Sequence, residues 1–278
     1  MVTLFGHGFI GSKYSSLYPC IINQRDDFVP KTDQLLYFIS TVDNYNVFTN
    51  PHLDINTNLN LLIETLEHCK NNKNTVFNFA SSWFVYGEVA SNATEESYCN
   101  PKGFYSITKR TAEQLLISYC QTFDLNYRIF RFANVVGAGD VKTSSKKNAL
   151  GFLVRKLVYN EDINLYENGN FYRDYVHVED VCHAINMLLQ TETDQIINIG
   201  TGKPVLFSEI ISYVIKKVGS KSKIFNIEQP QFHKVVQNKS FFMNCDKLIS
   251  YNFKFKHNIY SILDELIVEA EKNEKISH

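Results

Sequence analysis

Val2-Thr3-Leu4-Phe5-Gly6-His7-Gly8-Phe9-Ile10-Gly11 is a short apolar run that leads directly into a Gly-x-Gly-x-x-Gly fingerprint. In such a turn, Gly6 permits the tight bend, Gly8 lets the backbone approach a pyrophosphate, and Gly11 allows the next helix to pack closely on the strand. The start of that helix presents unpaired amides to the phosphates. The stretch therefore predicts the first strand, turn and helix of a Rossmann fold, with Gly6, Gly8, Phe9, Ile10 and Gly11 at the dinucleotide.

A second apolar run, from Val76 to Ala80, has the β-branched and aromatic residues of a buried parallel strand. Ser81 and Ser82 follow it, at the end of the strand where open α/β sheets bind their ligands. Further along, Tyr105 and Lys109 are four residues apart in a helical pattern, so they share one face of the predicted helix.

These side chains are suited to proton transfer. A tyrosine hydroxyl titrates near pH 10, but a fixed cation such as Lys109 favours the phenolate. Ser82 can bond the same substrate oxygen that Tyr105 protonates or deprotonates. We therefore predict that Ser82, Tyr105 and Lys109 are catalytic, although a Tyr-x-x-x-Lys pair taken alone could be an ordinary pair on a helix surface.

Together with the later segment Arg173-Asp174-Tyr175-Val176-His177-Val178-Glu179-Asp180, these motifs resemble those of the extended short-chain dehydrogenase/reductases. That family comprises nucleotide-sugar epimerases, dehydratases and 4-ketoreductases, and the resemblance spans Val2 to about Lys247. It implies an NAD(P) cofactor that Tyr105 and Lys109 also contact, and a nucleoside diphosphate sugar as substrate. It further implies that Asn134 and Arg173 bind this substrate together with Ser82, Asn134 within an Arg-x-x-Asn-x-x-Gly segment and Arg173 through paired bonds to the diphosphate.

The same resemblance implies the domain organisation. The fold class is α/β, with a Rossmann-type doubly wound parallel sheet and a smaller, discontinuous C-terminal substrate lobe. The expected Rossmann domain is residues 1–140, completed by about 174–202. Residues 141–173 and 203–278 are expected to form the nucleotide-sugar-binding lobe. Helices are expected at Leu53 to Lys70 and from Tyr105 onward, and in the family these two often pair across a homodimer.

The end of the second predicted strand departs from the family pattern. Folds that prefer NAD carry an acidic residue there, which accepts hydrogen bonds from the ribose 2′-hydroxyl. This chain has Asn23 followed closely by Arg25, a pair that suits a 2′-phosphate and favours NADP; the alternative is that Asp26 or Asp27 binds the ribose of NAD. Only a loop fits before the next strand, Leu35 to Ser40, so the usual third strand and its helix are expected to be missing.

The residues after Ser82 narrow the reaction. The family's 4,6-dehydratases have Asp-Glu there, whereas Trp83 and Phe84 cannot transfer protons. The Cys and His of the 3,5-epimerising members are also missing, at Phe84 and in Ala138-Gly139-Asp140. Of the family's reactions, this leaves hydride transfer at C4 of the sugar. Arg25 favours a 4-keto-6-deoxy sugar reductase that uses NADPH; the alternative is a 4-epimerase with tightly bound NAD, and a lesser alternative is a non-catalytic dinucleotide sensor.

Composition limits the partners, the metal sites and the location that we expect for the protein. The chain has 278 residues and a net charge of −1, which gives no reason to expect nucleic acid as a partner. No apolar run approaches the roughly 20 residues of a membrane span. The six cysteines and eight histidines show no metal-ligand spacing, so we predict no metal site and free thiols in a reducing cytoplasm. A first strand at Val2 also leaves no room for a signal peptide.

Overall fold

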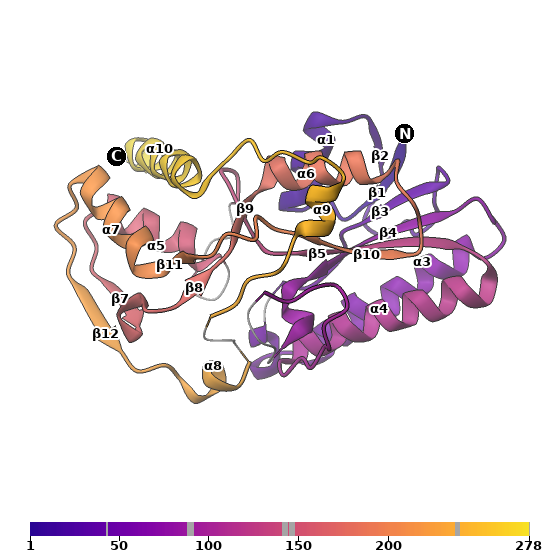
Figure 1. Ribbon diagram of the computed structural model, residues 1–278, viewed down its shortest axis with the longest axis horizontal. Helices are drawn as coiled ribbons and strands as arrows, with labels where there is room; N and C mark the ends of the chain where they lie inside the picture. The colour runs from indigo at the N-terminus through magenta and orange to yellow at the C-terminus, as the bar shows by residue number, and fades with distance from the viewer. Residues whose placement is uncertain (43, 88–91, 141–143, 145–147, 237–239, 278) are drawn as a thin grey trace.

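The computed structural model describes residues 1–42, 44–87, 92–140, 144, 148–236 and 240–277, and its main element is a parallel sheet of six strands (Figure 1). The strand order is β10-β5-β4-β3-β1-β2. The strands are β1 (Val2–Phe5), β2 (Cys20–Ile22), β3 (Gln34–Tyr37), β4 (Val76–Ser82), β5 (Asn126–Phe132) and β10 (Gln195–Ile199). Crossovers on both sides of β1 make the sheet doubly wound, which confirms the predicted fold class.

Each strand of this sheet is buried on both faces because successive side chains point to opposite sides. In β1, Leu4 belongs to the core beneath α1 (Phe9–Leu17) and α6 (Val178–Leu188). Phe5 belongs to the core on the opposite face, beneath α3 (Leu61–Cys69) and α4 (Phe104–Phe123). The apolar runs met in the sequence are therefore continuous because both faces are covered.

The family usually has a further strand and a helix between the second strand and the one that corresponds to β3 here. Both are missing among the described residues, as the short spacing predicted. From β2 the chain passes through an irregular loop to β3, on the other side of β1, so that β2 forms the edge of the sheet. The loop is fastened to β1, where Thr3 Oγ1 accepts a 3.0 Å hydrogen bond from the amide of Lys31. The amide of Asn23 donates to the carbonyl of Leu4 over 2.9 Å.

A second group of elements lies on the left of Figure 1, and part of it packs around an apolar core of its own. Its elements are α5 (Ala149–Val158), β7 (Ile163–Tyr166), η4 (Glu167–Gly169), β8 (Tyr172–Arg173), β11 (Val205–Leu206), α7 (Phe207–Val218), β12 (Ile224–Ile227), α8 (Gln231–Val236) and α10 (Ile259–Ser277). We call this group the small lobe. Two strands, β6 (Asn134–Val136) and β9 (Tyr175–His177), pair in parallel where the chain passes between the sheet and the small lobe. α9 (Asp246–Ser250) lies against β10. The predicted domain limits stay a prediction.

The predicted helix from Leu53 to Lys70 is interrupted. The structure has α2 (His52–Ile55), a π-helical segment η2 (Asn56–Asn60) and then α3. Buried polar side chains explain the irregularity: Asn58 Oδ1 accepts from the amide of Thr41 over 2.9 Å, and Asn58 Nδ2 donates to Thr108 of α4. Of the helices in the described part of the chain, none combines the length and the apolar character that a bilayer crossing needs.

Candidate active site

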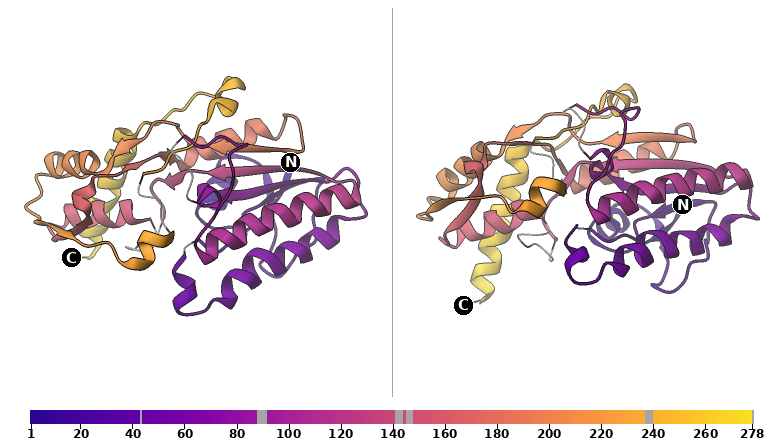
Figure 2. Two further views of the ribbon diagram at one scale, coloured as in Figure 1. Left: turned by 60° about the horizontal axis from the view of Figure 1, so that its bottom comes forward. Right: turned by 90° about the horizontal axis from the view of Figure 1, so that it is seen from below.

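A cleft of about 1550 Å³ runs between the carboxyl ends of the sheet strands and the small lobe. Pockets for a single drug-sized ligand are about 300–1,000 Å³, so this cleft has room for a dinucleotide and a second ligand together. Its lining draws on the turn after β1, the ends of β4 and β5, the start of α4 and the strands of the small lobe. Figure 2 shows the small lobe beside the sheet and its helices.

The glycine turn forms one part of this cleft, with Gly6, Gly8, Phe9, Ile10 and Gly11 all in its lining. Gly6 has φ +90°, and a Cβ there would lie 2.7 Å from the amide nitrogen of Ile39. A Cβ on Gly11 would lie 2.3 Å from the carbonyl oxygen of Gly6, whereas one on Gly8 would meet nothing within 4 Å. The turn therefore leaves an open approach to the backbone at Gly8 and to the first amides of α1, which fits a pyrophosphate.

The two serines at the end of β4 have different surroundings. Ser81 is buried and donates a 2.6 Å hydrogen bond to the carboxylate of Glu113. Ser82 is half-buried in the cleft wall and accepts a 3.3 Å hydrogen bond from the amide of Phe84. Because the hydroxyl of Ser81 is held inside the protein, Ser82 is the serine that a ligand can reach.

Tyr105 and Lys109 line the same cleft from the first turns of α4. Lys109 is almost completely buried, and its Nζ donates to the carbonyl of Ala80 over 2.6 Å and lies 4.1 Å from the ring centre of Phe79. Burial lowers the pKa of Lys109 to about 7, and the nearby carboxylate of Glu113 opposes this shift. The structure thus brings together Ser82, Tyr105 and Lys109, which the sequence proposed as a set.

Behind this set lies an ion-pair network that the sequence analysis missed. Glu113 is fully buried and bonds Arg131 of β5 through both carboxylate oxygens, at 3.0 and 2.8 Å, and Arg110 at 2.8 Å. Burial raises the pKa of Glu113, but the bonds from Arg131 and Ser81 reverse this effect and keep it below its ordinary value. Glu113 is four residues after Lys109, so helical spacing was the signal that could have found it.

The other two predicted substrate residues, Asn134 and Arg173, also line the cleft. The side-chain amide of Asn134 donates to the carbonyl of Asp174 over 2.9 Å, which ties β6 to β9. Arg173 donates to the carbonyl of Tyr172 over 2.8 Å, and its guanidinium lies 4.7 Å from the ring centre of Phe171. Asp174 accepts hydrogen bonds from Thr201 and Gly202.

Arg25 lies in an exposed turn after β2 and outside the lining of the cleft. Asn23 is buried instead, and its amide donates to the carbonyls of Asp27 and Val29 within the same loop. Asp27 is occupied as well, because its carboxylate accepts from the amide of Val29 and pairs with Lys31 at 3.0 Å. The roles predicted for Arg25 and Asp26 at the ribose stay predictions.

The charges around the cleft favour an anionic ligand. Its described lining contains the cations Lys13, Lys109, Lys156 and Arg173 and a single carboxylate, Asp140. Lys13 and Lys156 were not predicted. Neither could have been found from a motif, since Lys13 lies in the first helix without special spacing and Lys156 lies in a small-lobe helix whose position depends on the tertiary fold.

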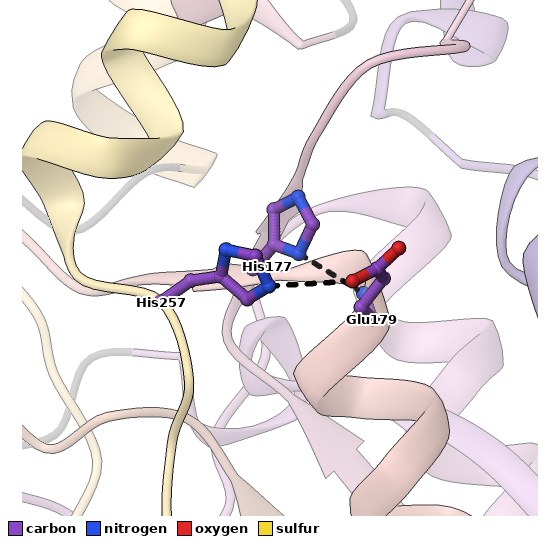
Figure 3. Close-up of side chains that lie close together, drawn as sticks. All are labelled: His177, Glu179 and His257. Carbon is purple, nitrogen blue, oxygen red and sulfur yellow. Dashed lines mark hydrogen bonds and ion pairs between the residues drawn. The ribbon is translucent and has the colours of Figure 1, made fainter.

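A cluster of possible metal ligands, His177, Glu179 and His257, lies beside α6 (Figure 3). Its side chains already have protein partners. His177 accepts from the amide of Glu179 over 3.3 Å and bonds Glu265 of α10 at 2.6 Å. Glu179 pairs with Lys13 and with His257, each at 3.3 Å. The ring centres of His177 and His257 lie 3.8 Å apart, with an angle of 31° between the ring planes. The cluster is accounted for as a hydrogen-bond and ion-pair network.

Comparison with known proteins identifies the family of this chain. The model of the NAD dependent epimerase/dehydratase family matches residues 24–200. A putative UDP-glucose 4-epimerase of Methanocaldococcus jannaschii is 28% identical over 180 residues, which are 64% of this chain and 58% of that protein. A UDP-glucuronate 4-epimerase of Thermodesulfobacterium geofontis is 26% identical over 188 residues, 66% of this chain and 56% of that protein. The chain thus spans little more than half the length of these curated relatives.

Solved structures match over the whole chain. The UDP-glucose 4-epimerase of Thermotoga maritima, solved with UDP-glucose, has a TM-score of 0.86 at 18% identity and covers 100% of this chain and 99% of its own. RMD from Pseudomonas aeruginosa, complexed with NADPH, has a TM-score of 0.85 at 19% identity over 98% of this chain and 99% of its own. At these identities the likeness establishes the fold.

Proposed function

Because the chain belongs to the NAD-dependent epimerase/dehydratase family, we propose that it is a nucleotide-sugar 4-epimerase that inverts C4 of a nucleoside diphosphate sugar with bound NAD. The observation that carries this proposal is the meeting of Ser82, Tyr105 and Lys109 in one cleft with the glycine turn. Of the curated relatives named above, one is described as a putative UDP-glucose 4-epimerase and the other as a UDP-glucuronate 4-epimerase, which supports the epimerase over the reductase that the sequence favoured.

In this proposal the residues of the cleft have separate roles. Tyr105 takes the proton of the C4 hydroxyl and later returns it, while Ser82 holds the same oxygen. Lys109 supplies the positive field that favours the phenolate of Tyr105. The glycine turn would hold a nicotinamide dinucleotide, which would supply the hydride acceptor and donor. Arg173 and Lys156 both line the cleft, and in this proposal they hold the diphosphate, so that the sugar can turn while the nucleotide stays bound.

The dehydratase reaction of the family needs groups that are missing from the described lining of this cleft. Elimination of water requires an acid and a base next to the catalytic serine, and the residues there are aromatic. Trp83 is buried and stacks on Phe241 with ring centres 4.8 Å apart, and Phe84 stacks on Trp83 at 4.1 Å. Asp140 is the single carboxylate of the described lining and lies on the loop after β6.

The test is to incubate the purified protein with UDP-glucose, UDP-galactose or UDP-glucuronate and to separate the products by chromatography. The epimerase interconverts the C4 epimers with no net change in nicotinamide absorbance. A protein that leaves these sugars unchanged, but oxidises NADPH stoichiometrically with a UDP-linked 4-keto-6-deoxy sugar, is the reductase. Arg25 and the non-acidic Asn23 are the observations that favour this second candidate.

We also propose that the protein forms a homodimer. α3 and α4 lie side by side on one face of the sheet (Figure 2), and Ile63, Ile107 and Leu115 on these helices are exposed by 38, 45 and 37%. Exposed apolar residues on neighbouring helices suit a helix-to-helix interface. Light scattering of the purified protein should give twice the chain mass of 32.1 kDa, and a monomer would contradict this part of the proposal.

A further inference from the structure

The segment that carries β8 and β9 presents every second side chain to the cleft (Figure 1). Phe171, Arg173 and Tyr175 all belong to the lining. The residues between them point elsewhere: Tyr172 is exposed by 46% and lies outside the lining, and Asp174 is buried. Successive side chains of an extended chain point to opposite sides, so this alternation is expected. The result is a row of three side chains along the cleft, of which Tyr175 has no role so far.

The hydroxyl of Tyr175 is accessible and has no partner. It forms no hydrogen bond with any other residue of the described chain. It is not a buried atom either, because the buried side-chain atoms without a partner in the described chain belong to other residues: Asn23, Tyr37, Asp54 and His233. Nevertheless the hydroxyl is surrounded by protein, since burial is the main influence on its pKa. A hydroxyl that is deep in the protein and still accessible faces the cleft that its residue lines.

The chemistry around this hydroxyl indicates its partner. Burial raises the pKa of Tyr175, and the guanidinium of Arg173 opposes this shift only in part, so the hydroxyl keeps its proton at neutral pH. A phenolic hydroxyl can donate this proton in a hydrogen bond, whereas a guanidinium has no acceptor to offer it. The positive charge of Arg173 also attracts anions. An oxygen anion in the cleft would therefore satisfy both side chains at once.

The position of Tyr175 in the row identifies the anion. Arg173, which is proposed to hold the diphosphate, lies on β8 of the small lobe, and Tyr175 lies two residues closer to the sheet. There it pairs in register with Asn134 at the start of β6, directly after β5 of the sheet. We propose that Tyr175 is a substrate-binding residue, whose hydroxyl donates to an oxygen of the sugar-bearing phosphate of the nucleoside diphosphate sugar. This inference rests on the proposed function, since it adds a contact to the same substrate.

Two substitutions isolate the hydroxyl. Tyr175→Phe removes it and keeps the ring, which packs against the apolar core of the small lobe. Tyr172→Phe is the matched control, because it makes the same chemical change three residues earlier, on the side of the segment that points away from the cleft.

The experiment is titration calorimetry of the full chain, saturated with NAD, against UDP-glucose and UDP, with UMP measured as a competitor of UDP-glucose. We expect Tyr175→Phe to weaken UDP-glucose and UDP by about ten-fold or more, as the loss of a hydrogen bond to a charged group predicts. KM for UDP-glucose should rise by a similar factor at unchanged kcat. UMP lacks the second phosphate, so it should bind Tyr175→Phe and the wild type equally. Tyr172→Phe should match the wild type, and neither variant should change the affinity for NAD or the melting temperature.

Other results overturn the inference in distinguishable ways. If the wild type binds UDP-glucose and Tyr175→Phe binds it equally well, the hydroxyl makes no contact with the substrate and the proposed function stands. If UMP is weakened as much as UDP, the hydroxyl does not bond the sugar-bearing phosphate. If Tyr175→Phe lowers the melting temperature and weakens NAD and UDP-glucose alike, the role of Tyr175 is structural.

The proposed function can fail separately. If the wild type inverts no UDP-sugar but binds UDP, and Tyr175→Phe weakens UDP and spares UMP, the contact with the diphosphate stands and the epimerase does not. If the wild type binds none of UDP, dTDP and GDP, the proposed function and this inference fail together.

Discussion

The two walls of the cleft are built in different ways. On the sheet wall, Ser82 ends the seven-residue strand β4, and Tyr105 and Lys109 lie on the 20-residue helix α4. On the small-lobe wall, Arg173 lies on the two-residue strand β8 and His233 on the six-residue helix α8. Long elements packed in a core hold side chains more firmly than short ones. We infer that the sheet wall carries the chemistry and that the small-lobe wall determines which substrate binds.

The largest effect is expected on the sheet wall. Tyr105→Phe removes the hydroxyl that carries the proton, so kcat should fall about 10³-fold, within the range for general acid and base catalysis. The binding of NAD and UDP-glucose should change little, since the ring remains. Initial rates of UDP-galactose formation from UDP-glucose, with calorimetry for both ligands, measure this prediction.

The control for this change is Tyr119→Phe, on the same helix but outside the lining of the cleft. It should keep the wild-type rate. If Tyr105→Phe also keeps its rate, the assignment of the proton transfer to Tyr105 is wrong, and with it the distinction between a catalytic wall and a binding wall.

The next largest effect is expected on the stability of the fold, when the ion-pair network behind the sheet wall is broken. Glu113→Gln leaves Arg131 buried without its ionic partner, and breaking a buried pair in this way costs about 3 kcal/mol or more of the free energy of unfolding. Urea denaturation at neutral pH measures it, with the exposed Glu67→Gln as the control that should stay near the wild type. An unchanged midpoint for Glu113→Gln would show that the network does not support the catalytic set.

The sheet wall could be predicted from the sequence because its signals are local. A glycine fingerprint, an apolar run that ends in Ser82, and a helical spacing between Tyr105 and Lys109 each lie within a few residues. The loop between Asp27 and β3 was likewise too short for a strand and a helix, so the missing third strand could be predicted from length alone. The family and the fold class were confirmed on this basis.

The small-lobe wall depends on contacts between distant residues. His233 meets Tyr45 across 188 positions of the chain, and the short helix that carries it has no periodic pattern to detect. The π-helical segment at Asn56–Asn60 was missed for a related reason. It depends on the buried bonds of Asn58 to Thr41 and Thr108, which no local propensity contains.

A smaller effect is expected where the two walls join, at His177. Burial lowers its pKa, and the carboxylate of Glu265 only partly opposes this; His257 opposes protonation too, and Glu179 favours it. The unfolded chain binds the proton more readily, so the stability that His177 contributes is complete above its ordinary pKa of about 6.5 and is lost as the pH falls below it. The wild type should therefore lose more stability between pH 7.5 and 5.5 than His177→Asn.

Urea denaturation at several pH values checks this, because Asn can still accept the hydrogen bond at the start of α6. His68→Asn, at an exposed position of α3, should follow the wild-type curve. Parallel curves for the wild type and His177→Asn would exclude His177 as the titrating group.

The smallest effect concerns Arg25, in the exposed turn after β2 and outside the lining of the cleft. Because this side chain is exposed, a contact with a 2′-phosphate should contribute only about 1 kcal/mol. Arg25→Ala should then raise Kd for NADPH about five-fold and leave Kd for NADH unchanged, with Gln24→Ala as the neighbouring control. Titration calorimetry with both cofactors would show the difference. Equal values for the wild type and Arg25→Ala with both cofactors would mean that Arg25 does not select the cofactor, and the main argument for a reductase would then be lost.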